Sequence, residues 1–295
     1  MRIAIAGATG HVGRPLAEGL AIRGNEVRVI ARGETRLKSL RYGVKACVGS
    51  LDDEEFLKKA LDGVKAAFVV IPTDLGAQDL RAYQRRLTLA WTAAIRATGV
   101  RRVVTLSSIG AQFSAGTGPI AGLHDLEQAM NALKHVHVLH LRPGYFMENL
   151  LMGMGLIKAD GVYGSPLRAD LAIPMIATRD IAAVALDILW TSRFVGNTVR
   201  ELLGPRDYTL SEATRILGNA IGKSGLRYVE LPYDQARQAM LNAGASPSVA
   251  DSFIDMARAF NQGVVRPTET RSASNTTPTL LETFAGDVFF QAFAA

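Results

Sequence analysis

The sequence predicts an α/β fold, namely a doubly wound parallel sheet of the Rossmann type with a smaller C-terminal α/β lobe. Short apolar runs alternate with amphipathic stretches along the first half of the chain, as in parallel sheets covered by helices on both faces. Glycines at positions 7, 10 and 13 interrupt the chain where the first strand should give way to a helix. After residue 144 the alternation loosens into turn-rich segments. We therefore expect one domain over residues 1–150 and a smaller lobe over residues 151–295, mixed with the last strands of the sheet.

The expected elements follow from hydrophobic periodicity and from the positions of glycine and proline. Buried strands are expected over residues 2–7, 26–32, 66–72, 101–108 and 135–144. Helices are expected over residues 14–24, 56–63, 79–98, 124–134 and 178–190. The segment 266–280 is polar, and we expect a loop there before a short terminal helix.

Length and composition are those of a globular protein with a sizeable core. The chain has 295 residues, of which 48% are hydrophobic and 20% charged. Cys47 is the only cysteine, so no intrachain disulfide can form, and we expect a cytoplasmic protein. No stretch reaches the roughly 18 uninterrupted apolar residues of a membrane helix, and we find no export signal. We expect no membrane association.

The net charge of +6 raises the question of a nucleic-acid partner. The basic residues are scattered, however, and the densest group, between Arg81 and Arg102, alternates with apolar residues at helical spacing. That pattern is typical of a solvent-exposed helix face. No nucleic-acid-binding motif accompanies it, so we expect no nucleic-acid partner.

The three glycines form the pattern G-x-x-G-x-x-G, one residue longer at its first gap than the dinucleotide-binding pattern G-x-G-x-x-G. Glycine after the first strand lets backbone N–H groups and the following helix N-terminus approach a pyrophosphate without obstruction by a Cβ. The helix dipole favours that negative charge. Because the pattern follows a strand and opens a helix within a βαβ unit, it predicts dinucleotide binding rather than a glycine turn without a ligand.

The end of the second strand distinguishes between cofactors. An acidic side chain there accepts the 2′-hydroxyl of NAD, whereas this chain has Arg32, with Arg36 and Lys38 close behind. A guanidinium favours a 2′-phosphate, so we expect Arg32 and Arg36 to bind the cofactor and NADPH to be favoured over NADH. The alternative is that Arg32 is an ordinary solvated charge at a strand end.

Several segments resemble one known family. The segments “GATGHVG”, “ARGETRLKSL”, “VVTLSSIGA” and “LRPGYFMENL” are similar to those of the NmrA-like atypical short-chain dehydrogenase/reductases, as are the later “PMIATRDIAAVAL” and “LLGPRDYTLSEAT”. That family includes NADPH-dependent quinone and azo reductases and redox-sensing regulators. The resemblance implies a Rossmann-type NAD(P)-binding domain and a small substrate lobe, with nicotinamide and substrate in the cleft between them.

The resemblance also implies which residues form the site. Around the pyrophosphate it places Gly7, Thr9, Gly10, His11, Val12 and Gly13, and at the 2′-phosphate Arg32. Near adenine it places Asp52, and along the inner cofactor path Val70, Ile71 and Pro72. Beside the nicotinamide it places Ser107 and Ser108, and on the far side Pro143, Gly144, Tyr145 and Phe146.

The chain departs from the wider superfamily in its proton donor. It has no Tyr-x-x-x-Lys motif, in which an ammonium lowers the pKa of the tyrosine so that the phenol can exchange a proton with a carbonyl oxygen. His124 stands near the expected tyrosine position, at the start of a predicted helix, where it could donate a proton, cap the helix or simply face solvent. Tyr145 is the second catalytic candidate. The expected substrate contacts are Ser108, Tyr145, Phe146 and Asn149, although the three polar ones could instead hold a turn or a helix start.

The missing acid favours soft acceptors. Reduction of an unactivated ketone needs a matched proton donor or an oxyanion stabiliser, whereas a quinone or azo acceptor gives a delocalised anion and depends mainly on positioning. We expect NADPH-dependent reduction of a small conjugated acceptor such as a quinone or azo compound. The alternatives are a non-catalytic NADP(H)-binding redox sensor, and a carbonyl or imine reductase that uses His124. A homodimer is left open.

No metal site is expected. His135, His137 and His140 lie in a predicted strand, and the first two would share a face. A zinc site would need a third ligand at suitable spacing, and none is evident.

Overall fold

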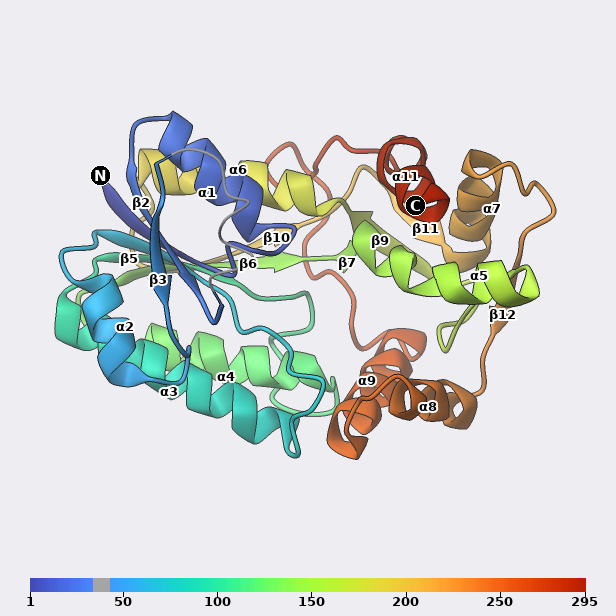
Figure 1. Cartoon of the computed structure of the whole chain (residues 1–295), viewed down its shortest axis with the longest axis horizontal. Helices are drawn as coiled ribbons and strands as arrows, with labels where there is room; N and C mark the ends of the chain where they lie inside the picture. The colour runs from blue at the N-terminus through green and yellow to red at the C-terminus, as the bar shows by residue number, and fades with distance from the viewer. Residues whose placement is uncertain (34–42) are drawn as a thin grey trace.

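The structure, a computed structural model that describes residues 1–33 and 43–295, is built on a seven-stranded parallel sheet. The strand order is β10-β6-β5-β4-β1-β2-β3 (Figure 1). The strands are β1 (Arg2–Ala6), β2 (Glu26–Ala31), β3 (Lys45–Val48), β4 (Ala66–Val69), β5 (Arg102–Leu106), β6 (His137–Pro143) and β10 (Asn197–Leu202). The chain runs outward from β1 to one edge of the sheet and then returns through β4 to build the other half, as in a doubly wound sheet. The predicted fold class is confirmed.

Helices cover both faces of this sheet, which explains why its central strands are apolar. The helices α1 (Gly13–Ile22) and α6 (Thr178–Thr191) cover one face, and α2 (Glu54–Leu61), α3 (Leu80–Thr98) and α4 (Pro119–Asn131) cover the other (Figure 1). Along β1, Ile3 and Ile5 belong to the core cluster shared with α1 and α6, whereas Ala4 and Ala6 belong to the cluster shared with α2 and α3. Successive side chains of a strand point to opposite faces, so both faces must be apolar.

Every strand and helix predicted for the first 150 residues is present, with starts that differ by one or two residues in most cases and by five in α4. α4 begins at Pro119, so the predicted helix start at His124 is wrong. Proline suits the first turn of a helix, and Gly118 before it has a φ of +57°. β6 begins at His137, because His135 has a φ of +63° and lies in the turn before the strand. The edge strand β3 was not predicted, since it is short and mostly exposed and therefore shows no apolar alternation.

A smaller lobe holds a three-stranded sheet of order β11-β9-β7 and a parallel pair of order β12-β8. Its strands are β7 (Tyr145–Phe146), β8 (Val162–Ser165), β9 (Ala172–Ile176), β11 (Asp207–Thr209) and β12 (Arg227–Glu230). Its helices are a 3₁₀ segment (Met147–Gly153), α5 (Met154–Asp160), α7 (Leu210–Ala220), α8 (Tyr233–Asn242), α9 (Pro247–Asn261), α10 (Leu281–Phe284), a π-helical segment (Ala285–Phe289) and α11 (Phe290–Ala294). The division at residue 150 stays a prediction: β7 precedes it but pairs with β9, and α6 and β10 follow it but belong to the large sheet.

The polar segment 266–280 is largely a loop, as predicted, and two carboxylates bind it to the large sheet and to helix α6. The fully buried Glu201 of β10 accepts hydrogen bonds from the backbone N–H of Thr268 (2.9 Å) and of Glu269 (2.9 Å). Asp180 of α6 accepts hydrogen bonds from the backbone N–H (3.0 Å) and the hydroxyl (2.7 Å) of Thr279. We call residues 268–279 the strap. It leads into the terminal helices, which complete the core of the lobe.

Over the two described ranges, no helix combines the length and the apolar character that a bilayer crossing requires.

Candidate functional site

The glycine-rich turn after β1 has the shape that the sequence predicts. Gly7 has a φ of +68°, and a Cβ on it would lie 2.6 Å from Cγ1 of Val70, at the end of the neighbouring strand. A Cβ on Gly13 would lie 2.3 Å from the carbonyl oxygen of Gly7. The N–H of Gly10 donates to that same oxygen at 2.9 Å and closes the turn. Gly7 and Gly13 are therefore required by the packing of the chain itself.

Gly10 differs from the other two glycines. It is exposed, it has no positive φ, and a Cβ on it would meet only the Gly7 oxygen, at 3.4 Å. The packing of the protein therefore leaves room for a side chain at this position. A ligand bound against the backbone here would fill that room and would explain why the residue is glycine. The following helix α1 begins with no side-chain cap and no acidic residue in its first turn. The Arg14 N–H donates to the Gly10 carbonyl at 3.1 Å and Pro15 has no N–H, so within the described ranges it is the backbone N–H of Gly13 that remains available to an anion at this helix start.

The other predicted residues of the turn divide by exposure. Thr9 is half-buried and His11 exposed, whereas Val12 is buried in the core cluster beside α1. At Val12, therefore, the backbone can face a ligand but the side chain cannot.

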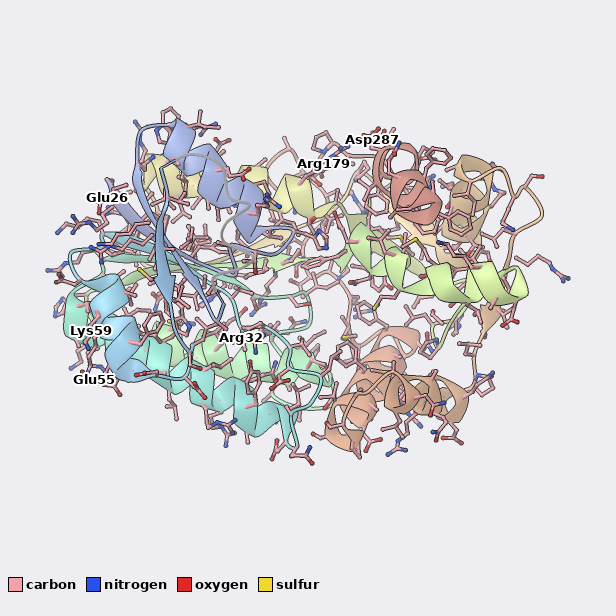
Figure 2. All side chains as sticks on the ribbon, in the orientation of Figure 1. Glu26, Arg32, Glu55, Lys59, Arg179 and Asp287 are labelled. Atoms are coloured by element: carbon pink, nitrogen blue, oxygen red, sulfur yellow. The ribbon has the colours of Figure 1, made fainter. Side chains whose placement is uncertain are left out.

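A free cation stands at the end of β2. Arg32 is exposed (Figure 2), and it makes no hydrogen bond or ion pair with any residue within the described ranges. Tyr83 of α3 lies close enough for the Arg32 charge to oppose the rise in the pKa of this phenol that burial causes. Asp52, after β3, is exposed and accepts a hydrogen bond from the Ser50 hydroxyl. The second predicted cation, Arg36, lies outside the described residues.

The remaining predicted residues lie at the carboxyl ends of the next strands, where ligands of open α/β sheets bind. Val70, Ile71 and Pro72 follow β4, and Ser107 and Ser108 follow β5. Pro143 ends β6 and Gly144 follows it, with its N–H donating to the Leu202 carbonyl at 2.9 Å. A Cβ on Gly144 would lie 2.3 Å from the carbonyl oxygen of Pro174, so this glycine is needed where the large sheet meets β9. The chain thus brings the predicted positions to the end of the sheet at which the parallel strands have their carboxyl ends.

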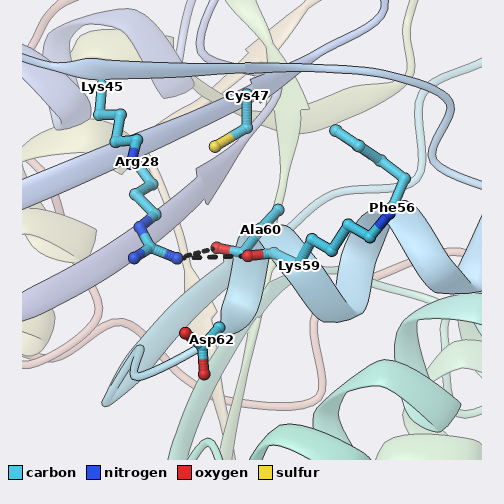
Figure 3. A pocket seen from close by; sticks show the side chains of 7 residues that line it. All are labelled: Arg28, Lys45, Cys47, Phe56, Lys59, Ala60 and Asp62. Carbon is cyan, nitrogen blue, oxygen red and sulfur yellow. Dashed lines mark hydrogen bonds between the residues drawn. The ribbon is translucent and has the colours of Figure 1, made fainter.

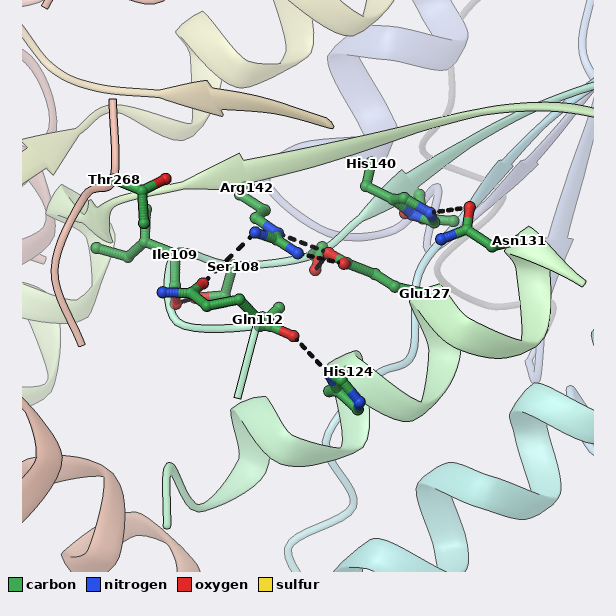
Figure 4. Close-up of polar contacts among 12 residues, drawn as sticks. Ser108, Ile109, Gln112, His124, Glu127, Asn131, His140, Arg142 and Thr268 are labelled. Carbon is green, nitrogen blue, oxygen red and sulfur yellow. Dashed lines mark hydrogen bonds and ion pairs between the residues drawn. The ribbon is translucent and has the colours of Figure 1, made fainter. Parts of the chain in front are cut away.

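A buried ion pair lies beneath this carboxyl end of the sheet (Figure 4). Glu127 of α4 is 2% exposed and receives two hydrogen bonds from Arg142 of β6, at 2.5 and 2.9 Å. The Ser107 hydroxyl donates to the same carboxylate at 2.5 Å. Burial alone would raise the pKa of Glu127, but the hydrogen bonds from Arg142 and Ser107 outweigh it and hold the pKa below its ordinary value. Because its proton is engaged with Glu127, the Ser107 oxygen can take part in a further hydrogen bond only as an acceptor.

The sequence analysis missed Glu127 and Arg142. The available signal was Arg142, at the end of a predicted strand that from Val136 to Leu141 is apolar apart from two histidines. A guanidinium in a buried strand needs a carboxylate partner. The sequence alone does not show that α4 supplies that partner.

His124 lies within α4, and its Nδ1 is 2.9 Å from the carbonyl oxygen of Ala111. Since a carbonyl can only accept, Nδ1 carries the proton of this hydrogen bond. In the neutral ring Nε2 then has a lone pair, and only the imidazolium could donate a proton from it. The cap role considered for His124 is wrong, because the helix begins five residues earlier. Its role as a proton donor stays a prediction.

Tyr145 and Phe146 lie next to each other in β7 but pack against different clusters. Tyr145 packs in the lobe, with its ring edge-on to Phe260 at 6.4 Å between ring centres. Phe146 packs against the cluster beneath α1 and α6. Burial raises the pKa of the Tyr145 phenol well above its ordinary value, so the hydroxyl stays protonated at physiological pH. It has no hydrogen-bonding partner in the part of the chain that the structure describes, and it can therefore donate to an acceptor oxygen.

Two further substrate candidates have different surroundings. The Ser108 hydroxyl donates to the carbonyl of Ile109 at 2.9 Å and so holds its own turn, which is the alternative that the sequence left open. Asn149 is half-buried in the 3₁₀ segment after β7, and its side chain makes no hydrogen bond within the described ranges. Contact of either residue with a substrate stays a prediction.

The three histidines near β6 do not gather. His135 lies in the preceding turn, so the prediction that it shares a strand face with His137 is wrong. The Nδ1 of His137 accepts a hydrogen bond from the Gly196 N–H at 3.0 Å. His140 is buried, with Nδ1 2.7 Å from the Thr105 hydroxyl and Nε2 3.0 Å from the Asn131 amide oxygen. Among the described residues, no three His, Cys, Asp or Glu side chains are arranged to hold a metal.

The buried His140 predicts a loss of stability in mild acid. Burial lowers the pKa of His140, so the folded protein keeps the ring neutral at a pH where the unfolded chain is already protonated. The stability that this residue contributes is complete above the unfolded pKa of about 6.5 and is lost as the pH falls through that value toward the folded pKa. We expect the midpoint of urea unfolding to decrease between about pH 7 and 5, and the decrease to be smaller in His140→Gln. An equally steep decrease in that variant would contradict this assignment.

Comparison with known proteins gives one family. A sequence model described as the NmrA-like family matches residues 1–282. The (4-alkanoyl-5-oxo-2,5-dihydrofuran-3-yl)methyl phosphate reductase of Streptomyces griseus is 33% identical over 262 residues, which cover 88% of this chain and 88% of that protein. The NAD(P)H azoreductase of Xenophilus azovorans is 29% identical over 255 residues, which cover 86% and 85%.

Two solved structures share the fold. The NADPH-dependent quinone oxidoreductase QOR2 of Escherichia coli, complexed with NADPH, superposes with a TM-score of 0.78 at 23% identity, covering 97% of this chain and 99% of that one. The triphenylmethane reductase of a Citrobacter species, complexed with NADP(H), superposes with a TM-score of 0.75 at 20% identity, covering 99% of each chain.

Proposed function

Since the chain belongs to the NmrA-like family, we propose that it is an oxidoreductase that transfers hydride from NADPH to a small conjugated acceptor, such as a quinone or an azo compound. The observation that carries this proposal is Gly10, whose lack of a side chain nothing in the packing of the protein requires. Two relatives point the same way, because both are named as reductases and one of them as an NAD(P)H azoreductase.

The residues at the carboxyl ends of the strands fit a phosphorylated dinucleotide. The backbone of the turn from Gly7 to Gly13 and the uncapped start of α1 would hold the pyrophosphate, with Gly10 giving the closest approach. Arg32 would pair with the 2′-phosphate, since it has no other partner within the described ranges. Ser107, whose proton is committed to Glu127, would accept a hydrogen bond from the carboxamide of the nicotinamide.

The proposed chemistry follows from the absence of a Tyr-x-x-x-Lys motif in this chain. When bound, NADPH supplies the hydride. The protein has to position an acceptor between Ser107 and the lobe, exclude water and stabilise the charge left on the acceptor. The Tyr145 phenol, protonated and without a partner among the described residues, can donate a hydrogen bond to that charge but is too weak an acid to release its proton readily. A delocalised acceptor anion needs only this much assistance.

Turnover with a panel of acceptors tests the proposal. We expect NADPH oxidation, followed by absorbance, with quinones or azo dyes and little or none with simple ketones. If the protein binds NADPH but oxidises it with no acceptor, the redox-sensor alternative is correct and the proposed activity is wrong. A cytoplasmic location, a small-molecule partner and a homodimer remain predictions alongside this proposal.

Arg32→Ala tests the choice of cofactor. Removing a guanidinium from a phosphate loses a charge-assisted hydrogen bond, so the Kd for NADPH should rise about tenfold, while the Kd for NADH should change little. Isothermal titration with both cofactors measures this difference. Arg14→Ala is unsuitable as a control, since Arg14 lies at the start of α1, so Arg101→Ala on an exposed loop serves instead. Equal weakening of both cofactors would contradict the 2′-phosphate role.

His124→Ala tests the remaining catalytic alternative. A carbonyl or imine reductase that uses imidazolium as its acid should lose about a hundredfold or more in kcat. For a quinone acceptor we expect a change of less than about threefold, because proton donation is not needed for hydride transfer to a delocalised acceptor. His124→Gln, which can keep the hydrogen bond to Ala111, separates a structural effect from a catalytic one.

A further inference from the structure

A cavity of about 350 Å³ opens at the far edge of the sheet, between β2, β3 and α2 (Figure 3). In the sheet register Arg28 neighbours Lys45 and Ile30 neighbours Cys47, so Arg28, Lys45 and Cys47 lie on the same face of the sheet, beneath α2. From α2 the cavity is lined by Phe56 and Lys59. None of these residues belongs to the turn or the strand ends assigned to NADPH above.

Arg28 is a buried guanidinium with incomplete hydrogen bonding. Its side chain lines the cavity and the residue is 8% exposed. Nη1 donates to the carbonyl oxygens of Ala60 (2.9 Å) and Lys59 (3.4 Å), at the end of α2. Nε is buried without a partner, and Nη2 makes no hydrogen bond within the described ranges. Buried donors are rarely left unpaired in native proteins, so this side chain is prepared for a further partner.

The two unused nitrogens define the chemistry of that partner. Nε–H and the Nη2 amine lie along one edge of the planar guanidinium, and this edge matches the two oxygens of a carboxylate. Lys45 and Lys59 are exposed at the rim, and neither pairs with a carboxylate in the described part of the chain. Asp62 is the one acidic residue among those lining the cavity, so the lining carries net positive charge. Phe56 and Cys47 supply an apolar wall.

We propose that this cavity is a binding site for a small carboxylate whose body is partly apolar. Arg28 pairs with its two oxygens, Lys45 and Lys59 attract it, and Phe56 packs against its body. Cys47 stands in the wall and reports occupancy, because a bound molecule covers the thiol. As the only cysteine of the chain, Cys47 gives a thiol reaction that reads this cavity alone.

The experiment follows the reaction of Cys47 with the neutral disulfide dithiodipyridine. The thiolate attacks one disulfide sulfur, a mixed disulfide forms as the S–S bond breaks, and the leaving pyridinethiolate takes up the proton that the thiol gave to solvent. Burial raises the pKa of the Cys47 thiol, with Arg28 and Lys45 opposing the rise, so the reaction is run above neutral pH. We expect benzoate to slow it saturably, and sodium chloride or inorganic phosphate at matched ionic strength to slow it less.

An anionic reagent provides the second measurement. At low ionic strength we expect dithiobis(nitrobenzoate) to be favoured over dithiodipyridine about tenfold more strongly by Cys47 than by free cysteine, because a cationic cleft concentrates anions. Salt should reduce this preference. A preference no greater than that of free cysteine would overturn the proposal, and so would phosphate that protects as well as benzoate.

Matched variants separate the planar edge from the charge. Arg28→Lys keeps the positive charge but loses the edge, so protection by benzoate should disappear. Lys45→Ala, at an exposed position, should weaken protection even if Arg28→Lys fails to fold. Lys65→Ala removes an exposed lysine outside the cavity and should change nothing. Unchanged protection in Lys45→Ala, or in a folded Arg28→Lys, would overturn the assignment, whether or not the protein oxidises NADPH.

Discussion

Replacing Gly10 with alanine should raise the Kd for NADPH about a hundredfold and leave the free energy of unfolding nearly unchanged. A Cβ here would meet only the Gly7 oxygen at 3.4 Å, and the backbone has no positive φ, so the fold can accept it. A pyrophosphate held by the backbone N–H groups of the turn could not, because the methyl group would hold it away from them. Losing two charge-assisted hydrogen bonds costs about 3 kcal/mol or more, which corresponds to this change in Kd.

Titration calorimetry and urea unfolding, run on the same preparations, measure the two effects. Gly155→Ala is the control, since a Cβ there meets nothing within 4 Å and the residue lies in α5 of the lobe. It should leave binding unchanged. Gly13→Ala is a second comparison, because its Cβ would lie 2.3 Å from the Gly7 oxygen and should reduce stability as well as binding. If Gly10→Ala binds NADPH like the unmodified protein, the turn does not hold the pyrophosphate as proposed.

Replacing Glu127 with alanine should lower the free energy of unfolding by about 3–5 kcal/mol, the largest single effect on stability that we expect. The carboxylate is 2% exposed and pairs with Arg142, whose side chain is 12% exposed. Removing the acid leaves a buried guanidinium without its counter-charge, and the solvation that this cation lost on folding is no longer compensated. Glu127→Gln keeps the shape but not the charge and should be intermediate.

The double variant Glu127→Leu/Arg142→Met tests this reasoning. When both charges are replaced by apolar groups of similar size, no charge remains unpaired, so the pair should be less destabilised than Glu127→Ala. Asp251→Ala is the surface control, because Asp251 pairs with Arg237 where both side chains are exposed or nearly so, and it should change stability little. A double variant at least as unstable as Glu127→Ala would mean that the packing of Glu127, rather than the unpaired charge, is what matters.

The same substitution links stability to the proposed site. Glu127 holds the Ser107 hydroxyl at 2.5 Å, so a variant without the carboxylate frees that proton and changes which hydrogen bond Ser107 can offer. In the proposed site Ser107 would position the cofactor without taking part in proton transfer, so we expect Glu127→Gln to raise KM for NADPH more than it lowers kcat.

The fold could be predicted because its signals are local. The apolar strands, the amphipathic helices between them and the glycines after β1 each follow from neighbouring residues, and their alternation along the chain indicates a doubly wound parallel sheet. β3 escaped prediction because an exposed edge strand of four residues need not be apolar. The start of α4 is marked in the sequence by Gly118 and Pro119, but the first turn after them has no polar capping side chain and no acidic residue, so the usual signal of a helix start is weak there.

The site could be predicted only where a backbone pattern defines it. Gly7, Gly10 and Gly13 encode the turn directly, and Arg32 follows from its place after β2. The partners of Arg142 and of Arg28 could not be inferred, because the first depends on how α4 lies on β6 and the second on how α2 ends above β2. Side chains that are paired only by tertiary packing leave a charged residue in an apolar run as their one trace in the sequence.

The strap couples the unfolding of the lobe to the unfolding of the large sheet. Its ends are fastened to Glu201 of β10 and Asp180 of α6, while the helices that follow it bury Phe284 and Phe289 in the lobe. Unfolding of the lobe therefore weakens the hydrogen bonds between the strap and the large sheet. Unfolding of the sheet in turn removes the contacts that hold the terminal helices in the lobe. Thermal denaturation should accordingly be a single cooperative transition, and proteolytic nicking of the strap should loosen both halves together.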